Sequence, residues 1–118
     1  MQADQLELTA ENVMAELDKL ANPSHAATLR WFFKAGPGEY GEGDEFLGIK
    51  VPIIRQAAKP FRMLSDAEIE KLIQSPVHEH RFAALAILTY QFERAKDPGR
   101  QEEIFNLFLK FVDQGKVN

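Results

Sequence analysis

The sequence contains no cysteine in its 118 residues, which excludes a disulfide framework, a thiolate metal site and a cysteine nucleophile. It also lacks any run of roughly 18 apolar residues, the minimum for a membrane-spanning helix. Residues 1–20 carry five acids, without a basic start or an apolar stretch, so no secretory signal is expected. These absences fit a reducing compartment, and we expect a cytoplasmic protein without membrane contact.

Strand-like patterns are scarce as well. No segment alternates cleanly between apolar and polar side chains, and β-branched residues are few. Hydrophobic residues nevertheless make up 45% of the chain, which is enough for one modest core. The expectation is an all-α fold in a single domain spanning residues 1–118.

Capping residues and prolines divide the chain into six expected helices. The expected ranges are 10–21, 24–34, 52–59, 66–74, 76–95 and 98–114. The sequence offers these caps and stops: Thr9, Ser65 with Glu68 as a capping box, Ser75-Pro76, Asp97-Pro98, and Gly115 after the last helix. Six helices with mostly short links, taken in consecutive pairs, predict antiparallel hairpins stacked as an α-solenoid with degenerate repeats.

Helical spacing also predicts which faces are buried. Val13, Leu17, Leu20 and Ala21 form one stripe. In the second helix, Ala27 and Trp31 should face inward, together with Leu29 or Phe32. Residues 82–92, "FAALAILTYQF", are apolar nearly all round, so that helix should be buried on several sides.

The last expected helix has a very wide apolar face. Seven of the nine residues at positions 104–112 are apolar. A capping helix of a solenoid needs a polar outer side. We therefore expect further C-terminal helices, or another chain, to cover this face, which would make residues 1–118 the N-terminal part of a longer solenoid.

A glycine-rich stretch, "GPGEYGEGDEFLG" at residues 36–48, superficially matches two phosphate-binding patterns. The dinucleotide pattern requires a preceding strand, but a helix is expected here, and Pro37 lacks an amide donor. The P-loop requires a lysine directly after Gly48 and then a hydroxyl, and neither is present. We expect no nucleotide cofactor; the stretch is interpreted as a connector between hairpins, anchored by Phe46 and Leu47.

Other chemical signals are weak. The loop acids lack the spacing of a calcium-binding loop. His78 and His80 are two residues apart on an expected helix, so they point to different sides and cannot share one ion. No Ser-His-Asp arrangement stands out. No metal or other cofactor is expected, and spacing alone identifies no active site.

Charge is unevenly distributed. The net charge of −4 argues against a generally adhesive nucleic-acid binder. Residues 25–62 nevertheless contain six basic residues, and their four acids all lie in the glycine-rich loop. The charged residues of the flanking helices are therefore all basic. These helices present either solvated faces or a binding surface.

A family resemblance favours the binding surface. Residues 29–61, "LRWFFKAGPGEYGEGDEFLGIKVPIIRQAAKPF", resemble the opening of the DNA alkylation-repair family, the AlkD-like glycosylases built from HEAT-like repeats. The similar features are the aromatic helix end, the motif from Tyr40 to Asp44, and the segment from Phe46 to Pro52 with Arg55 and Lys59 beyond it. Residues 64–88, "LSDAEIEKLIQSPVHEHRFAALAIL", are also similar, and the resemblance covers about residues 9–118.

The resemblance implies a DNA-repair hydrolase. Its members grip duplex DNA on a concave face and cleave the N-glycosidic bond of positively charged N3- or N7-alkylated purines. A tryptophan and an aspartate in a Trp-Asp-x-x-Asp-like motif carry the chemistry. That motif is expected just beyond Asn118, so no catalytic residue is expected within the chain, and Trp31 is not the catalytic tryptophan.

The resemblance also implies DNA contacts within the chain. Trp31 and Lys50 match positions near DNA, and Arg55 is a further DNA-binding candidate. Two alternatives stay open: Trp31 as a core aromatic, and Arg55 paired with the loop carboxylates. Because the broad family includes DNA binders without demonstrated base excision, the alternative function is a non-catalytic HEAT-like module that binds DNA or protein.

Overall fold

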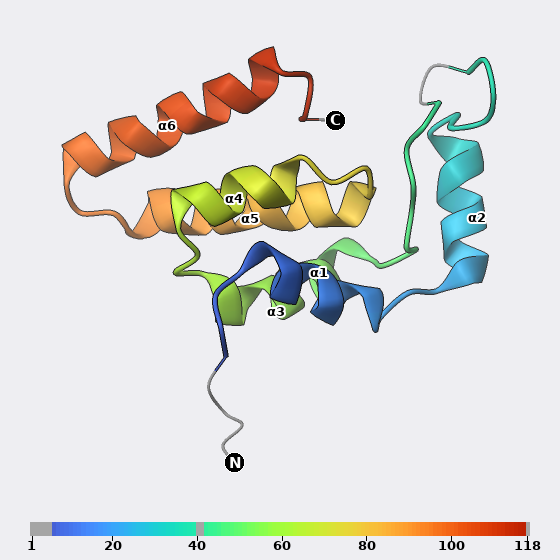
Figure 1. Ribbon diagram of the computed structural model, residues 1–118, viewed down its shortest axis with the longest axis horizontal. Coiled ribbons are helices and arrows are strands. Elements are labelled where there is room, and N and C mark those ends of the chain that lie inside the picture. The colour runs from blue at the N-terminus through green and yellow to red at the C-terminus, as the bar shows by residue number, and fades with distance from the viewer. Residues whose placement is uncertain (1–5, 40–41, 118) are drawn as a thin grey trace.

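The computed structural model describes residues 6–39 and 42–117, in which helices are joined by short links and one long loop (Figure 1). The helices are α1 (Ala10–Asp18), α2 (Pro23–Phe32), α3 (Val51–Ala58), α4 (Asp66–Ile73), α5 (His78–Arg94) and α6 (Pro98–Asp113), with a 3-10 turn, η1 (Lys59–Phe61), directly after α3. The all-α expectation is confirmed. Tyr40 and Gly41 of the family motif lie outside the described residues.

The helix starts follow mostly from local capping. The Thr9 side chain accepts a hydrogen bond from the N–H of Asn12 (3.1 Å), and Asp97 caps α6, as predicted. The predicted capping box is only half formed. Ser65 accepts from the N–H of Glu68 (3.3 Å), but the Glu68 carboxylate accepts from the N–H of Ala10 (2.8 Å) and so joins α4 to α1.

The start of α5 differs from the prediction of residue 76 with Ser75 as its cap. Val77 is extended because it pairs with Glu45 in an isolated parallel bridge, and Pro76 before it lies in a bend. The N–H of Glu45 donates to the Pro76 carbonyl (3.1 Å), and the N–H of His78 donates to the Glu45 carbonyl (2.8 Å). The helix therefore begins only at His78.

The helices form a stack of layers. In Figure 1, α6 lies above α4 and α5, which in turn lie above α1 and α3. The central helix α5 packs on α1, α3, α4 and α6, so the prediction that it is buried on several sides is confirmed. The main core includes Leu17, Ile54, Phe61, Leu72, Ile87 and Phe111. None of the described helices is long and apolar enough to cross a membrane.

Helix α2 stands to one side of this stack (Figure 1). It has a small hydrophobic cluster of its own, formed by Ala26, Ala35 and Phe46 with Leu29 packed against them. Leu29, one of the two alternatives predicted to face inward, does so, but other predicted inward positions were wrong. Ala27, Leu20 and Ala21 are exposed, and Ala26 is the buried residue of α2, because the helix packs on the loop around Phe46 and not on the main core.

Helix α6 buries Ile104 and Phe111 against the stack. It leaves Phe105, Leu109 and Val112 exposed by 51%, 42% and 45%. These three residues have helical spacing i, i+4 and i+7, so they form one apolar stripe on the outer side of α6.

Candidate nucleic-acid interface

Six basic residues flank the glycine-rich loop in the sequence: Arg30, Lys34, Lys50, Arg55, Lys59 and Arg62. All six are exposed, and within residues 6–39 and 42–117 none of them forms an ion pair. Of the other basic side chains, Lys19, Lys71, Arg81, Arg100 and Lys110 form ion pairs, whereas Arg94, Lys96 and Lys116 form none within the same residues. Six of the nine basic side chains without an ion pair in this part of the chain therefore lie on or next to α2, α3 and η1.

Trp31 lies at the C-terminal end of α2 and is 81% exposed. The alternative that it is a core aromatic is therefore wrong, as is its predicted inward orientation. Its neighbour Phe32 is also exposed, by 67%, and meets Phe33 edge to face (5.3 Å between ring centroids). An exposed tryptophan beside the unpaired cations Arg30 and Lys34 has the chemistry of a nucleic-acid contact.

Lys50 and Arg55 lie on the same short helix. Lys50 is the exposed N-cap of α3, and Arg55 is exposed one turn further on. The guanidinium carbon of Arg55 lies 5.9 Å from the centroid of the Phe82 ring on α5, within cation–π range. The alternative that Arg55 pairs with the loop carboxylates is wrong, because Arg81 takes that role with Asp44 (3.0 Å).

A groove of about 540 Å³ runs between α3 and α5. Three cations from α3 and η1 line it: Arg55, Lys59 and Arg62. The α5 side contributes Phe82, Tyr90 and one acid, Glu93. Positive charge along one wall and aromatic rings along the other suit an anionic strand.

The groove continues into a second cavity of about 400 Å³, which shares Arg62 and Tyr90 with it and reaches Arg94. The guanidinium carbon of Arg94 lies 4.1 Å from the centroid of the Tyr90 ring. Sequence reasoning did not single out Tyr90, because it interpreted residues 82–92 as buried on several sides, and it did not consider Arg94. Their i, i+4 spacing, which brings two side chains together on a helix, was the available signal.

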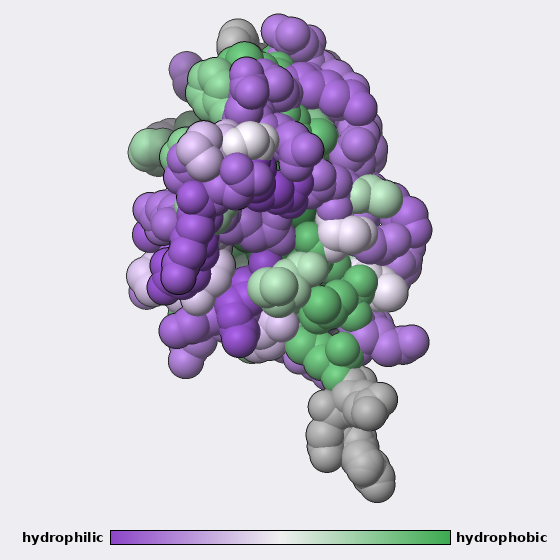
Figure 2. All heavy atoms as spheres, turned by 90° about the vertical axis from the view of Figure 1, so that its left-hand side faces the viewer, coloured by the Kyte–Doolittle hydropathy of each residue, from purple (hydrophilic) through white to green (hydrophobic). Residues whose placement is uncertain are grey.

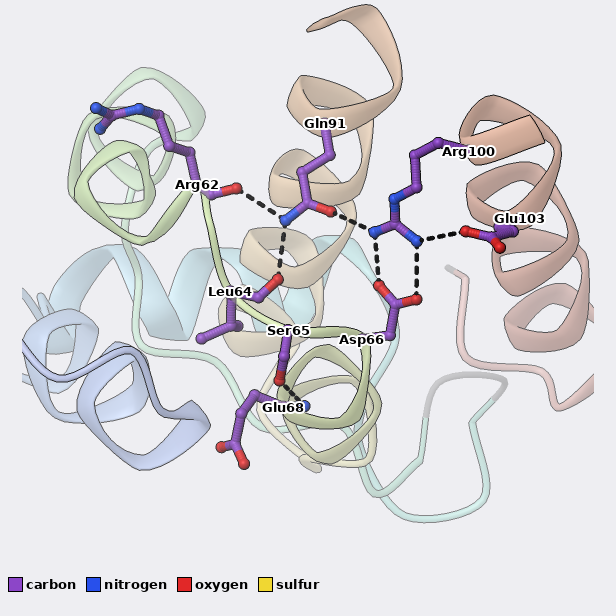
Figure 3. Close-up of polar contacts among 8 residues, drawn as sticks. All are labelled: Arg62, Leu64, Ser65, Asp66, Glu68, Gln91, Arg100 and Glu103. Carbon is purple, nitrogen blue, oxygen red and sulfur yellow. Dashed lines mark hydrogen bonds and ion pairs between the residues drawn. The ribbon is translucent and has the colours of Figure 1, made fainter. Parts of the chain in front are cut away.

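A hydrogen-bonded network fixes the far end of this groove (Figure 3). Gln91 on α5 donates to the carbonyls of Arg62 (2.8 Å) and Leu64 (2.9 Å). Its side-chain oxygen accepts from Arg100 (3.2 Å), which also holds Asp66 through two bonds. Figure 3 shows the Arg62 side chain pointing away from the network, so the network holds the backbone of Arg62 and not its charge.

This network shifts two ionisation equilibria. The Arg100 guanidinium lowers the pKa of the Asp66 carboxyl, chiefly by hydrogen bonding and against the effect of burial. The same bonds raise the pKa of Arg100. Both groups are therefore held in their charged forms.

The end of the glycine-rich loop is held by a buried carboxylate. The Glu79 side chain, fully buried on α5, accepts from the N–H groups of Leu47 (2.9 Å), Gly48 (3.0 Å) and Ile49 (3.3 Å). Gly48 has φ +86°, and a Cβ there would lie 2.2 Å from the Asn22 carbonyl oxygen. The interpretation of this stretch as a shaped connector agrees with these contacts.

Phe46 anchors the loop, as predicted. It is 7% exposed, stacks on Phe33 (5.6 Å between centroids) and contacts the His78 ring (5.1 Å). Burial among these rings lowers the pKa of His78; Arg81 lowers it further, while Glu79 and Asp44 act in the opposite direction.

A Ser-His-Asp chain is present although the sequence did not reveal it. The Oγ of Ser75 lies 2.8 Å from Nδ1 of His80, whose Nε2 lies 2.9 Å from Asp18. Ser75 is only 8% exposed, and its Oγ also accepts from the N–H of Val77 (3.1 Å). This chain fastens α1 to the start of α5, and neither of the two cavities described above reaches Ser75.

Metal binding finds no support among the described residues, where no three His, Cys, Asp or Glu side chains converge. His78 and His80 diverge, as predicted from their spacing: one packs on Phe33 and the other meets Asp18.

The side of the molecule beside the α5–α6 link is largely hydrophilic (Figure 2). A band of hydrophobic side chains lies there next to the start of the described chain, and further hydrophobic side chains appear near the top of this view. Leu6 and Leu8, which begin that chain, are exposed by 44% and 37%. Exposed apolar residues therefore occur in several parts of the surface, and those of α2 differ from the others by the basic residues beside them.

Comparison with known proteins gives one result. A family model described as DNA alkylation repair enzyme matches residues 13–117. No curated protein and no solved structure matches the chain. The match covers nearly all the described residues, including Trp31, Lys50 and the groove. The chain therefore belongs to the DNA alkylation repair enzyme family.

Proposed function

We propose that this chain is the N-terminal, DNA-binding part of a DNA glycosylase that excises positively charged N3- or N7-alkylated purines from duplex DNA. The observation that carries the proposal is that the six basic residues flanking the glycine-rich loop in the sequence are exposed and, within the described residues, form no ion pair. A protein of net charge −4 that leaves these cations exposed is suited to a polyanion, and three of them, Arg55, Lys59 and Arg62, line one groove.

The proposed roles follow from the geometry. Lys50 and Arg55 on α3 meet phosphates, with Lys59 and Arg62 continuing the contact along the groove. Trp31 stacks or packs at the duplex edge, since most of its ring is exposed. Cleavage of the glycosidic bond adds water to the sugar carbon and releases the base. In this proposal the tryptophan and aspartate that stabilise the cationic transition state follow Asn118.

DNA binding is tested by a salt titration of duplex affinity. Neutralising a phosphate contact reduces the slope of log K against log salt by about one. Lys50→Glu should weaken binding and flatten that slope. Lys19→Glu on α1, where the native lysine is paired with Glu16, provides the same charge change away from the interface. An unchanged slope for Lys50→Glu would count against the role of Lys50.

Base excision is tested separately, with the chain extended past residue 118. The assay measures release of 3- or 7-methylated purines from alkylated duplex DNA. Release is the expected result. If the protein binds duplex DNA but releases no base, the glycosylase part of the proposal is contradicted, while the DNA-binding part stands.

A second candidate function is a non-catalytic solenoid module that binds DNA or protein. The apolar stripe of Phe105, Leu109 and Val112 favours a contact on the outer side of α6. We propose that further helices, or another chain, pack on this stripe, as in a longer solenoid. The presence or absence of a Trp-Asp-x-x-Asp-like motif in such helices distinguishes the two functions.

A further inference from the structure

We propose that Glu79 is a positioning residue of the DNA interface, which sets Lys50 on α3 relative to Trp31 on α2. This inference rests on the proposed function and deepens it. Glu79 lies on α5 and is 0% exposed, so its side chain cannot contact DNA directly. Its influence would pass through the backbone segment 47–49, which it holds.

The segment 47–49 leads directly into α3. Glu79 accepts from three successive N–H groups of this segment, at 2.9, 3.0 and 3.3 Å. The next residue is Lys50, whose carbonyl accepts from the N–H groups of Ile53 and Ile54 (3.0 Å each) and so begins the helix. Because three consecutive amides are fixed, the direction in which α3 starts is fixed as well.

The same segment also holds α2. The N–H of Asn22 donates to the Leu47 carbonyl (2.7 Å), and Gly48 lies against Asn22 and Ala26. Helix α2 has its own small cluster, and this segment, Phe46 and the contact of Phe33 with His78 attach it to the rest of the molecule. One buried carboxylate therefore sets the relative positions of both candidate DNA-binding helices.

The chemistry of a carboxylate is required for this role. An ionised glutamate is an acceptor only, with two oxygens that can serve several donors. A glutamine keeps one acceptor and turns an NH₂ group toward backbone N–H groups, which are donors as well. Glu79→Gln therefore loses hydrogen bonds and places its NH₂ donors against backbone N–H donors, while the side-chain volume is almost unchanged.

The experiment compares Glu79→Gln with Glu70→Gln. Glu70 lies on α4, where it pairs with Lys110, so the control has the same charge change away from the segment. Duplex affinity is followed by the fluorescence of Trp31, the single tryptophan. We expect Glu79→Gln to bind duplex DNA about tenfold more weakly than Glu70→Gln. The amides of residues 47–49 should exchange hydrogen faster, while those of α5 stay protected.

A double-mutant cycle with Lys50→Ala separates positioning from general destabilisation. If Glu79 acts through Lys50, its loss has less effect on affinity when Lys50 is already absent. Equal losses in both backgrounds would overturn the inference, as would equal affinities of Glu79→Gln and Glu70→Gln. A wild-type chain that binds no duplex would instead contradict the proposed function.

If Glu79→Gln fails to fold, Asp44→Asn replaces it in the same measurements. Asp44 anchors the same loop to Arg81 from a partly exposed position, so its loss is milder. The same double-mutant cycle with Lys50→Ala applies, and a smaller loss of duplex affinity is expected. Equal losses of affinity with and without Lys50 would again contradict the inference.

Discussion

Arg100 and Asp66 are joined by two parallel hydrogen bonds of 3.0 and 2.9 Å, which tie the start of α6 to the start of α4. The fork of the guanidinium matches the carboxylate, as in the stronger class of ion pairs. Their side chains are 35% and 42% exposed, so solvent screens the pair. We expect it to contribute about 1 kcal/mol or less to the free energy of unfolding.

Asp66→Asn should therefore remove a pH-dependent part of stability. The pKa of Asp66 is lower in the folded than in the unfolded state, so its contribution is present above the unfolded value of about 4. That contribution is lost as pH falls through the lowered folded value. Urea unfolding at pH 7 and near pH 2 should show a loss of up to about 1 kcal/mol for Asp66→Asn at pH 7 only.

The control for this prediction is Glu103→Gln. Glu103 makes a single, more exposed contact with Arg100 at 3.2 Å, so its removal should change stability less. Equal losses for the two variants would contradict the importance of the paired geometry.

His78 should produce a second pH dependence, near neutrality. Burial lowers its folded pKa, so the unfolded chain takes up a proton more readily. Stability is full above the unfolded pKa of about 6.5 and decreases as pH falls from there toward the folded value. His78→Phe should flatten unfolding free energy between pH 7 and pH 5, and an unchanged profile would contradict this assignment.

Gly48→Ala should destabilise the fold by about 3 kcal/mol, since it combines a left-handed backbone with a steric clash. The added Cβ would lie 2.2 Å from the Asn22 carbonyl oxygen and 2.5 Å from the Ala26 nitrogen. Gly38, with φ +77° and open space around it, is the matched control. Gly38→Ala should lower the free energy of unfolding, measured in urea, by only about 1 kcal/mol. Similar losses for Gly38→Ala and Gly48→Ala would mean that the structure relieves the clash at Gly48.

Trp31→Ala should separate binding from stability. Because the ring is 81% exposed, unfolding free energy should change by less than about 0.5 kcal/mol. Duplex affinity, measured by anisotropy of labelled DNA, should decrease by about 1 kcal/mol. Phe32→Ala, at the neighbouring exposed aromatic, should have a smaller effect on affinity. A large stability loss in Trp31→Ala would contradict the exposed placement.

Sequence reasoning predicted the features that depend on near neighbours. The caps at Thr9 and Asp97 bond within three residues, and Gly115 ends α6 with φ +71°. The start of α5 was missed because its partner, Glu45, lies more than thirty residues away. The inward face of α2 was missed for the same reason, since Phe46 decides it.

The candidate site divides in the same way. The family motif identified Trp31, Lys50 and Arg55, and their roles in DNA binding stay predictions. The i, i+4 spacing of Tyr90 and Arg94 could have suggested their contact, but the groove that they line is formed by two helices, α3 and α5, and follows from neither sequence segment alone.

The separate hydrophobic cluster of α2 has a consequence for how this surface can vary. The buried residues of the α2 cluster are distinct from those of the main core. If α2 binds DNA as proposed, substitutions at its exposed end should alter recognition without weakening the stack. The fold can retain its core while ligand preference is changed there, either by natural divergence or by design.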